Sequence, residues 1–121
     1  MPDRTKKWPL FPPATEPEWS PLADIGRTRC GWLLKFDLAG VGLEDVTVSV
    51  RGRQVRIAGQ RRDWIVEEGF SHYSMEISYS RFERTIEMPC NLENTRVSLE
   101  ARDGFLLVRI LTEGNEGNEN V

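Results

Sequence analysis

The feature that most constrains the fold of this chain is a pair of alternating segments joined by a glycine-containing connection. Every second residue is apolar in both segments: Trp32, Leu34, Phe36 and Leu38 in the first, and Val46, Val48 and Val50 in the second. A period of two is typical of β-strands with one buried face. Gly40 and Gly42 allow the chain to turn, because glycine adopts positive φ at little cost. The connection is longer than a tight hairpin, so we expect the second strand to lie in the other sheet of a sandwich.

Short segments of the same kind follow at spacings near ten residues. Arg51-Gly52-Arg53 predicts a hairpin turn, and Asp103-Gly104 predicts another before the last strand. Alternation over residues 73–79 predicts a further strand. The side chains expected to point into the core are Val55, Ile57, Leu106, Val108 and Ile110. With 121 residues and no amphipathic helix pattern, the chain is expected to form one all-β, immunoglobulin-like antiparallel β-sandwich.

Composition narrows the classes of partner and the compartment. The chain carries 16 basic and 19 acidic side chains, for a net charge of −3. This balance gives no electrostatic basis for binding nucleic acid or an anionic membrane. No apolar stretch approaches the roughly 18 residues that a membrane span requires. Cys30 and Cys90 lack metal-like spacing and the sequence shows no export signal, so we expect free thiols and a cytoplasmic location.

No group of residues in the sequence predicts catalysis. His72 follows Ser71, but a catalytic triad also needs a third, orienting group that converges with them in space. Nothing marks Cys90 as an activated nucleophile. The adjacent carboxylates Glu67 and Glu68 lie in a turn-like, solvated setting. Without a phosphate-binding glycine loop or metal-ligand spacing, we expect no enzyme activity, no cofactor, no metal and no small-molecule substrate.

The connection between the first two strands carries a family resemblance. Phe36-Asp37-Leu38-Ala39-Gly40-Val41, followed by Glu44-Asp45-Val46, resembles the signature of the small heat-shock protein (α-crystallin domain) family. The segment that starts at Trp19 is similar to the family's W-x-P-x-x-D-I entry to its first strand. The hairpin at Asp103-Gly104 is similar to its D-G-x-L-x-V motif. The resemblance implies an α-crystallin domain fold.

The resemblance covers residues 19–111, which we expect to form this domain. Residues 1–18 are rich in proline and are expected to form a flexible arm. Residues 112–121 are almost devoid of apolar side chains and are expected to form a disordered polar tail.

The resemblance implies an ATP-independent chaperone, a holdase that binds partly unfolded proteins through apolar surface and prevents their aggregation. One implied surface is a groove between two strands, formed by Val48 and Val50 on one side and by Val97 and Leu99 on the other. Plain core packing is the alternative for these four residues. The second candidate surface is the arm, through Trp8, Leu10 and Phe11.

The resemblance also implies a homodimer formed by strand exchange through the long segment after Gly59. The candidate interface residues are Trp64, Ile65, Val66, Phe70 and Arg84. An exposed arginine of little energetic value is the alternative for Arg84. The family's C-terminal I-x-I/V motif has no counterpart after Leu111, so we predict a dimer or small assembly. Trp8-x-Leu10 is an alternative occupant of the groove.

Two other classes of binding protein share features with this sequence. A co-chaperone of the CS-domain type has a similar sandwich, but it lacks the exchanged strand. An adhesion or scaffold module would require one defined partner. An uncharacterised hydrolase is the remaining alternative. Suppression of aggregation of unrelated proteins, with and without ATP, separates these classes.

Overall fold

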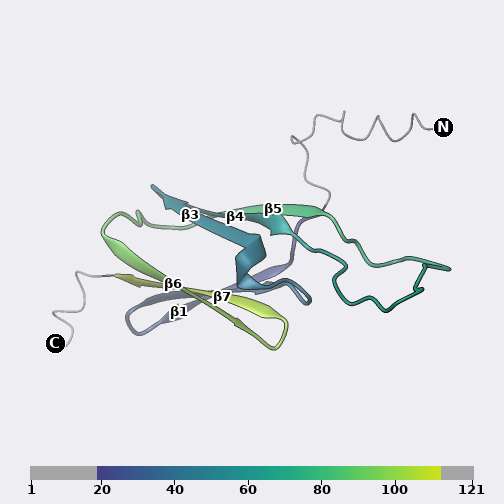
Figure 1. Cartoon of the computed structure of the whole chain (residues 1–121). Helices are drawn as coiled ribbons and strands as arrows, with labels where there is room; N and C mark the ends of the chain where they lie inside the picture. Colours follow the sequence, from purple (N-terminus) through teal and green to yellow (C-terminus); the bar gives the residue numbers. More distant parts are fainter. Residues whose placement is uncertain (1–18, 113–121) are drawn as a thin grey trace.

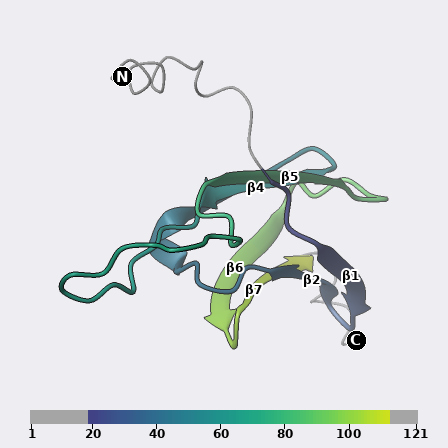
Figure 2. The same cartoon turned by 90° about the vertical axis from the view of Figure 1, so that its right-hand side faces the viewer.

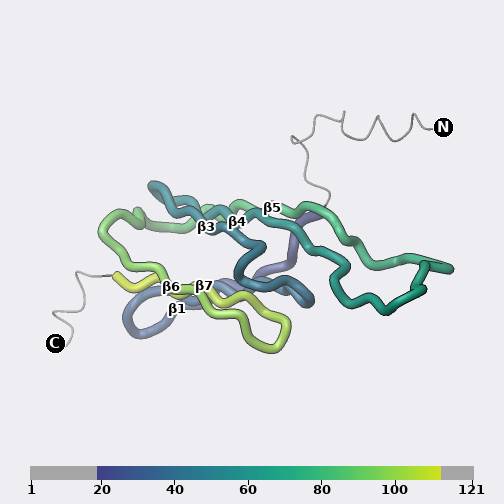
Figure 3. The backbone as a smooth tube through the Cα atoms, in the orientation of Figure 1, coloured from purple at the N-terminus to yellow at the C-terminus, as the bar shows by residue number. Residues whose placement is uncertain are grey.

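The computed structural model describes residues 19–112, which form two antiparallel sheets packed face to face (Figures 1 and 3). The strands are β1 (Ala23–Thr28), β2 (Gly31–Asp37), β3 (Val46–Arg51), β4 (Gln54–Gln60), β5 (Arg81–Glu87), β6 (Thr95–Arg102) and β7 (Phe105–Thr112). One sheet has the order β1-β2-β7-β6 and the other the order β3-β4-β5. The described residues contain no α-helix, only the 3-10 turn η1 (Leu43–Asp45). The prediction of an all-β antiparallel sandwich is confirmed.

The core lies between the two sheets and is built from the inward positions of their central strands. Its completely inaccessible side chains include Leu34, Phe36, Val55, Ile57, Phe82, Val108 and Ile110. The predicted inward positions of β2, β4 and β7 are therefore confirmed. Burying a side chain of this size contributes about 1.5–3 kcal/mol relative to leaving it in water. This core holds the two sheets together.

The connection from β2 to β3 carries the chain from the four-stranded sheet to the three-stranded sheet, as the sequence predicts. Gly40 has φ +84°, a conformation that other residues adopt only with strain. The backbone amide of Leu38 donates to the carbonyl of Gly104 at 2.9 Å, which ties this connection to the β6–β7 turn. The connection between the two sheets therefore begins beside the β6–β7 turn.

Residues 61–80, here called the long loop, contain no strand. The prediction of a strand over residues 73–79 is therefore wrong for the single chain, where β5 begins only at Arg81. The reason is physical, since these residues have no neighbouring strand to supply backbone hydrogen bonds. Figures 1 and 2 show the long loop extending well beyond the two sheets.

Candidate binding surfaces

Strands β3 and β6 are open edges of the sandwich. β3 ends the three-stranded sheet and β6 ends the four-stranded sheet, so each pairs with one neighbour only among the described residues. The turn η1, directly before β3, lies close to β6. An edge strand presents backbone donors and acceptors that can pair with another chain. These two edges are the first candidate surface.

The side chains of β6 that point toward the interior of the sandwich remain partly accessible to solvent. Val97 pairs with Ile110 and Leu99 pairs with Val108, and residues paired across strands share a face. Ile110 and Val108 are fully buried, whereas Val97 is 40% exposed and Leu99 is 39% exposed. Apolar side chains on β6 therefore line an uncovered margin of the sandwich.

The predicted partners on β3 lie in a different environment. Val48 pairs with Ile57 and Val50 pairs with Val55, so both valines face inward. They are half-buried and pack against the core cluster. Core packing thus accounts for much of their surface, while it leaves Val97 and Leu99 open. Their role in binding stays a prediction.

The long loop is the second candidate surface. Its predicted interface residues are largely exposed: Trp64 is 63% exposed, Ile65 70%, Val66 57% and Phe70 52%. The His72 ring meets the Phe70 ring edge-on at 4.9 Å, and its Nε2 lies 2.9 Å from Oδ2 of Asp63. One loop therefore gathers the apolar side chains that the sequence singled out, and their place in a dimer remains a prediction.

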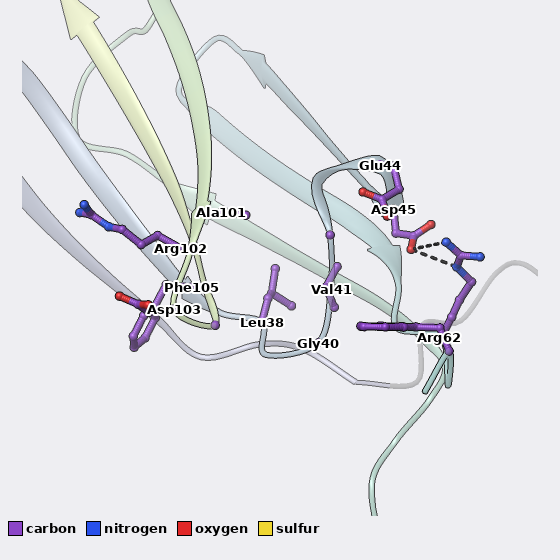
Figure 4. Close-up of a pocket in the computed structure, with 13 residues that line it drawn as sticks. Leu38, Gly40, Val41, Glu44, Asp45, Arg62, Ala101, Arg102, Asp103 and Phe105 are labelled. Atoms are coloured by element: carbon purple, nitrogen blue, oxygen red, sulfur yellow. Dashed lines mark hydrogen bonds and ion pairs between the residues drawn. The ribbon is translucent and has the colours of Figure 1, made fainter. Parts of the chain in front are cut away.

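A pocket of about 550 Å³ lies at the end of the sandwich, beside the start of the long loop. Figure 4 shows the Arg62–Asp45 pair on one side of this pocket and Asp103 and Phe105 on the other. Nη2 of Arg62 lies 2.9 Å from Oδ2 of Asp45. Trp64 also lines the pocket, so the beginning of the long loop rests against the sandwich.

Arg84 bonds within the subunit. Its Nη1 donates to the carbonyl oxygen of Pro21 at 2.7 Å, which joins β5 to the segment that enters β1. Its partner is thus a backbone carbonyl, and the side chain is half-buried, whereas the alternative interpretation was an exposed arginine. A role at a dimer interface stays a prediction.

Two carboxylates on the outer faces of the sheets are held in the charged form. Nε of Arg56 donates to Glu83 at 2.7 Å, and this bond lowers the pKa of Glu83 below its usual value. Nη1 of Arg109 donates to Glu100 at 2.8 Å and lowers the pKa of Glu100 in the same way. A carboxylate stabilised as the anion is a poor proton donor at neutral pH. Each pair joins two neighbouring strands of one sheet, β4 to β5 and β6 to β7.

Within residues 19–112, no three His, Cys, Asp or Glu side chains are grouped so that they could hold a metal ion. The same residues include no helix long and apolar enough to cross a membrane. Cys30 and Cys90 are both half-buried free thiols.

One polar cluster was missed by sequence reasoning. The guanidinium of Arg61 lies 4.4 Å from the ring centroid of Trp19 and also bonds to the carbonyl of Ala39. Trp19 begins a motif noted in the sequence, but Arg61 is far from it along the chain. Only the folded topology brings them together.

A model of the Hsp20/alpha crystallin family matches residues 24–121. Small heat shock protein C2 of Rickettsia felis is 26% identical over 97 residues, a match that covers 80% of this chain and 63% of the relative. Spore protein SP21 of Stigmatella aurantiaca is 27% identical over 94 residues, which cover 78% of this chain and 56% of the relative. The chain thus spans less than two thirds of the length of these curated relatives.

Solved structures show the same architecture. Heat shock protein 16.0 from Schizosaccharomyces pombe superposes with a TM-score of 0.66 at 26% identity, over 78% of this chain and 88% of that chain. HSP18.5 from E. histolytica superposes with a TM-score of 0.64 at 20% identity, over 78% of this chain and 89% of that chain. The second match shows the fold alone.

Proposed function

This chain belongs to the Hsp20/alpha crystallin family, and from that premise we propose that it is an ATP-independent chaperone that holds partly unfolded proteins and prevents their aggregation. The observation that carries the proposal is the accessible inner face of β6. Val97 and Leu99 lie 40% and 39% exposed on a strand whose outer edge has no neighbour among the described residues. An unfolded segment can supply the backbone hydrogen-bond partners and the apolar contacts that this edge lacks.

The proposed binding mode is addition of an extended client segment to the β6 edge. Backbone hydrogen bonds supply affinity that does not depend on client sequence, and apolar side chains at every second position supply contact area. Val48 and Val50 of β3 form the opposite wall of this proposed groove. Recognition of this kind selects exposed, apolar, extended chain, which is what a partly unfolded protein presents.

The test is an aggregation assay with a heat-labile enzyme, run with and without ATP. The wild-type chain should suppress light scattering equally well in both conditions. Leu99→Ser should reduce suppression several-fold, because it removes apolar area from the proposed groove. Ser98→Asp is the matched control, since Ser98 is exposed and pairs with Arg109 on the outer face of the same strand. Equal loss in both variants would contradict the assignment of this face.

The second candidate function is a CS-domain-like co-chaperone or another specific interaction module. The observation that favours a separate interaction surface is the exposed inner face itself, which one defined partner could also fill. Such a module would leave aggregation of unrelated enzymes unchanged. Suppression that appears only when another chaperone and ATP are added would favour the co-chaperone over the holdase.

We also propose that two copies form a dimer by exchanging the long loop. The loop carries several largely exposed apolar side chains and contains no strand, so it gains both backbone bonds and burial by pairing with a second copy. The proposed acceptor is the free edge of β1, where Ile25 is 43% exposed and the preceding Leu22 is 75% exposed. The edge of β5 is less open, because Trp19 bridges to Phe82 there.

Sedimentation velocity tests this dimer. Trp64→Asp together with Ile65→Asp should convert the dimer to a monomer, because two charges would have to be buried in the exchanged interface. Glu67→Asp and Glu68→Asp, in the same loop, should leave the dimer intact. A double Asp variant that sediments as the wild type does would assign dimerisation to another surface.

The proposed client surface of the arm, Trp8, Leu10 and Phe11, lies outside the described residues, as do residues 113–121 of the predicted tail. The first residue of that predicted tail, Thr112, belongs instead to β7. We propose that the arm adds binding area or fills the β6 groove between clients. Deleting residues 1–18 should change either the assembly size or the protection of clients. No change in either would remove the arm from the mechanism.

A further inference from the structure

Arg61 closes the base of the long loop. Its Nε donates to the carbonyl of Ser78 at 2.9 Å, and its Nη1 donates to the carbonyl of Ala39 at 3.1 Å. Its backbone amide donates to the carbonyl of Ser80 at 3.1 Å. These bonds join the first residue of the long loop to its last residues and to the β2–β3 connection. The two ends of the loop are therefore held together, while the apolar residues between them remain exposed.

Trp19, the first residue that the structure describes, lies against the same guanidinium. Cζ of Arg61 is 4.4 Å from the centroid of the indole, and Nε1 of Trp19 donates to the carbonyl of Ser80 at 3.2 Å. The carbonyl of Trp19 accepts a bond from the amide of Glu83 at 3.2 Å. The ring also packs at 5.1 Å against the ring of Phe82, which is fully buried. Trp19 is therefore anchored both to the loop stem and to β5.

Arg61 and Trp19 therefore both bond to the stem of the long loop, at Ser78 and Ser80, and also contact each other. We propose that Arg61 is a positioning residue that couples the docking of Trp19 to the closed state of the long loop. Trp19 directly follows residues 1–18 in the chain. Undocking of Trp19 would therefore loosen the loop stem, and opening of the stem would loosen the docking of Trp19. The use of this coupling in assembly rests on the proposed function, while the contacts themselves do not.

An arginine suits this position because its guanidinium is planar. It donates in its plane to Ser78 and Ala39 while its flat face lies over the indole of Trp19, which a lysine ammonium cannot do with the same geometry. The neighbouring Arg62 has a separate role, since its Nε and Nη2 both bond to Oδ2 of Asp45 in η1, at 3.0 and 2.9 Å. Arg62 therefore provides a matched control one residue away.

Amide hydrogen exchange, followed by NMR on the full chain, tests the coupling. In Arg61→Met, which keeps the aliphatic stem, the amide of Glu83 should exchange faster, although it bonds to Trp19 and not to Arg61. A cation–π contact corresponds to roughly threefold to thirtyfold in the opening equilibrium, and we expect acceleration in this range. Reciprocally, Trp19→Phe keeps a ring against Phe82 but loses the indole N–H, so the amide of residue 61 should exchange faster.

The controls separate coupling from general destabilisation. Amides of the central strand β7 should keep their wild-type rates in Arg61→Met, and Arg62→Met should leave the Glu83 amide unchanged. Arg61→Lys restores a cation over the indole and should recover part of the Glu83 protection. Combining Arg61→Met with Trp19→Phe should accelerate Glu83 by less than the product of the two single effects.

The proposal is overturned if Arg61→Met opens the loop stem while Glu83 keeps its protection. It is also overturned if Arg62→Met accelerates Glu83 as much as Arg61→Met does. Because the exchange rates are read on the chain without any client, a failure to suppress aggregation would refute the proposed function and leave this test intact.

Discussion

Strand β7 and the second half of the long loop both show alternating apolar side chains, but these side chains differ in burial. Val108 and Ile110 of β7 are fully buried, whereas Tyr73 is completely exposed and Ile77 is 57% exposed. β7 lies between β2 and β6 and pairs with both, while residues 73–79 have no neighbouring strand. A period of two therefore makes a strand only where another strand satisfies the backbone hydrogen bonds of the segment.

Apolar side chains lie in two different environments in this molecule. Between the sheets they hold the fold together, because their burial is complete within one chain. In the long loop they are mostly exposed, and along β6 Val97 and Leu99 are 40% and 39% exposed, so they remain accessible on the surface of the single chain. Substitutions in the first region should therefore change the free energy of unfolding, and substitutions in the second should change binding.

The largest expected effect contrasts two phenylalanines under the same substitution. Phe82→Ala should lower the free energy of unfolding by about 3–5 kcal/mol, because Phe82 is fully buried and its removal leaves a cavity. Phe70→Ala, in the long loop, should lower it by less than about 1 kcal/mol, because Phe70 is 52% exposed. Urea denaturation of monomeric material measures both. Similar losses of unfolding free energy in the two variants would contradict the distinction between the core and the long loop.

A smaller effect contrasts two strand glycines. A Cβ at Gly59 of β4 would collide with the backbone oxygen of Asp45 and approach Cζ of Phe82 at 2.7 Å, whereas a Cβ at Gly26 of β1 would meet nothing within 4 Å. Gly59→Ala should therefore cost about 1–3 kcal/mol of unfolding free energy. Gly26→Ala should be neutral or slightly stabilising, since it only restricts the unfolded chain. Equal thermal midpoints for the two variants would show that the β4 corner is not tightly packed.

The smallest expected effect is the pH dependence of stability that comes from the Arg56–Glu83 pair. The bond from Arg56 lowers the pKa of Glu83, so its contribution to stability is fully present above the usual value of 4.5. It is lost as the pH falls through the lower pKa of the folded state. Glu83→Gln should therefore be less stable than wild type at neutral pH, and the difference should shrink in acid. A difference that stays constant from neutral pH to well below 4.5 would contradict this origin.

Sequence reasoning predicted most of the sandwich because local signals and tertiary structure agree there. Positive φ at Gly40 and Gly52, at the predicted turns, illustrates this agreement. The alternation of Val97 and Leu99 predicted a strand but not its exposure, because exposure depends on β6 being the last strand of its sheet. Sequence alone could not foresee that residues 73–79 lack a neighbour within the chain.

The sequence predicted which residues belong to the candidate surfaces, but it did not predict how far each side chain is buried or what it contacts. The burial of Val48 and Leu99 cannot be ranked from their spacing, since burial on β3 is set by the core cluster that the folded chain builds. Arg84 required the folded chain as well, because its partner is the carbonyl of Pro21, 63 positions away. Contacts between distant segments are what the sequence pattern leaves open.

Site-specific photo-crosslinking gives the most direct test of the central claim, that the uncovered inner face of β6 binds unfolded chains. A photoreactive side chain placed at Leu99 should crosslink to a heat-denatured client, and the same group placed at Ser98 should not. Crosslinking should also be independent of ATP. Equal crosslinking from both positions, or from Ser98 alone, would contradict the account.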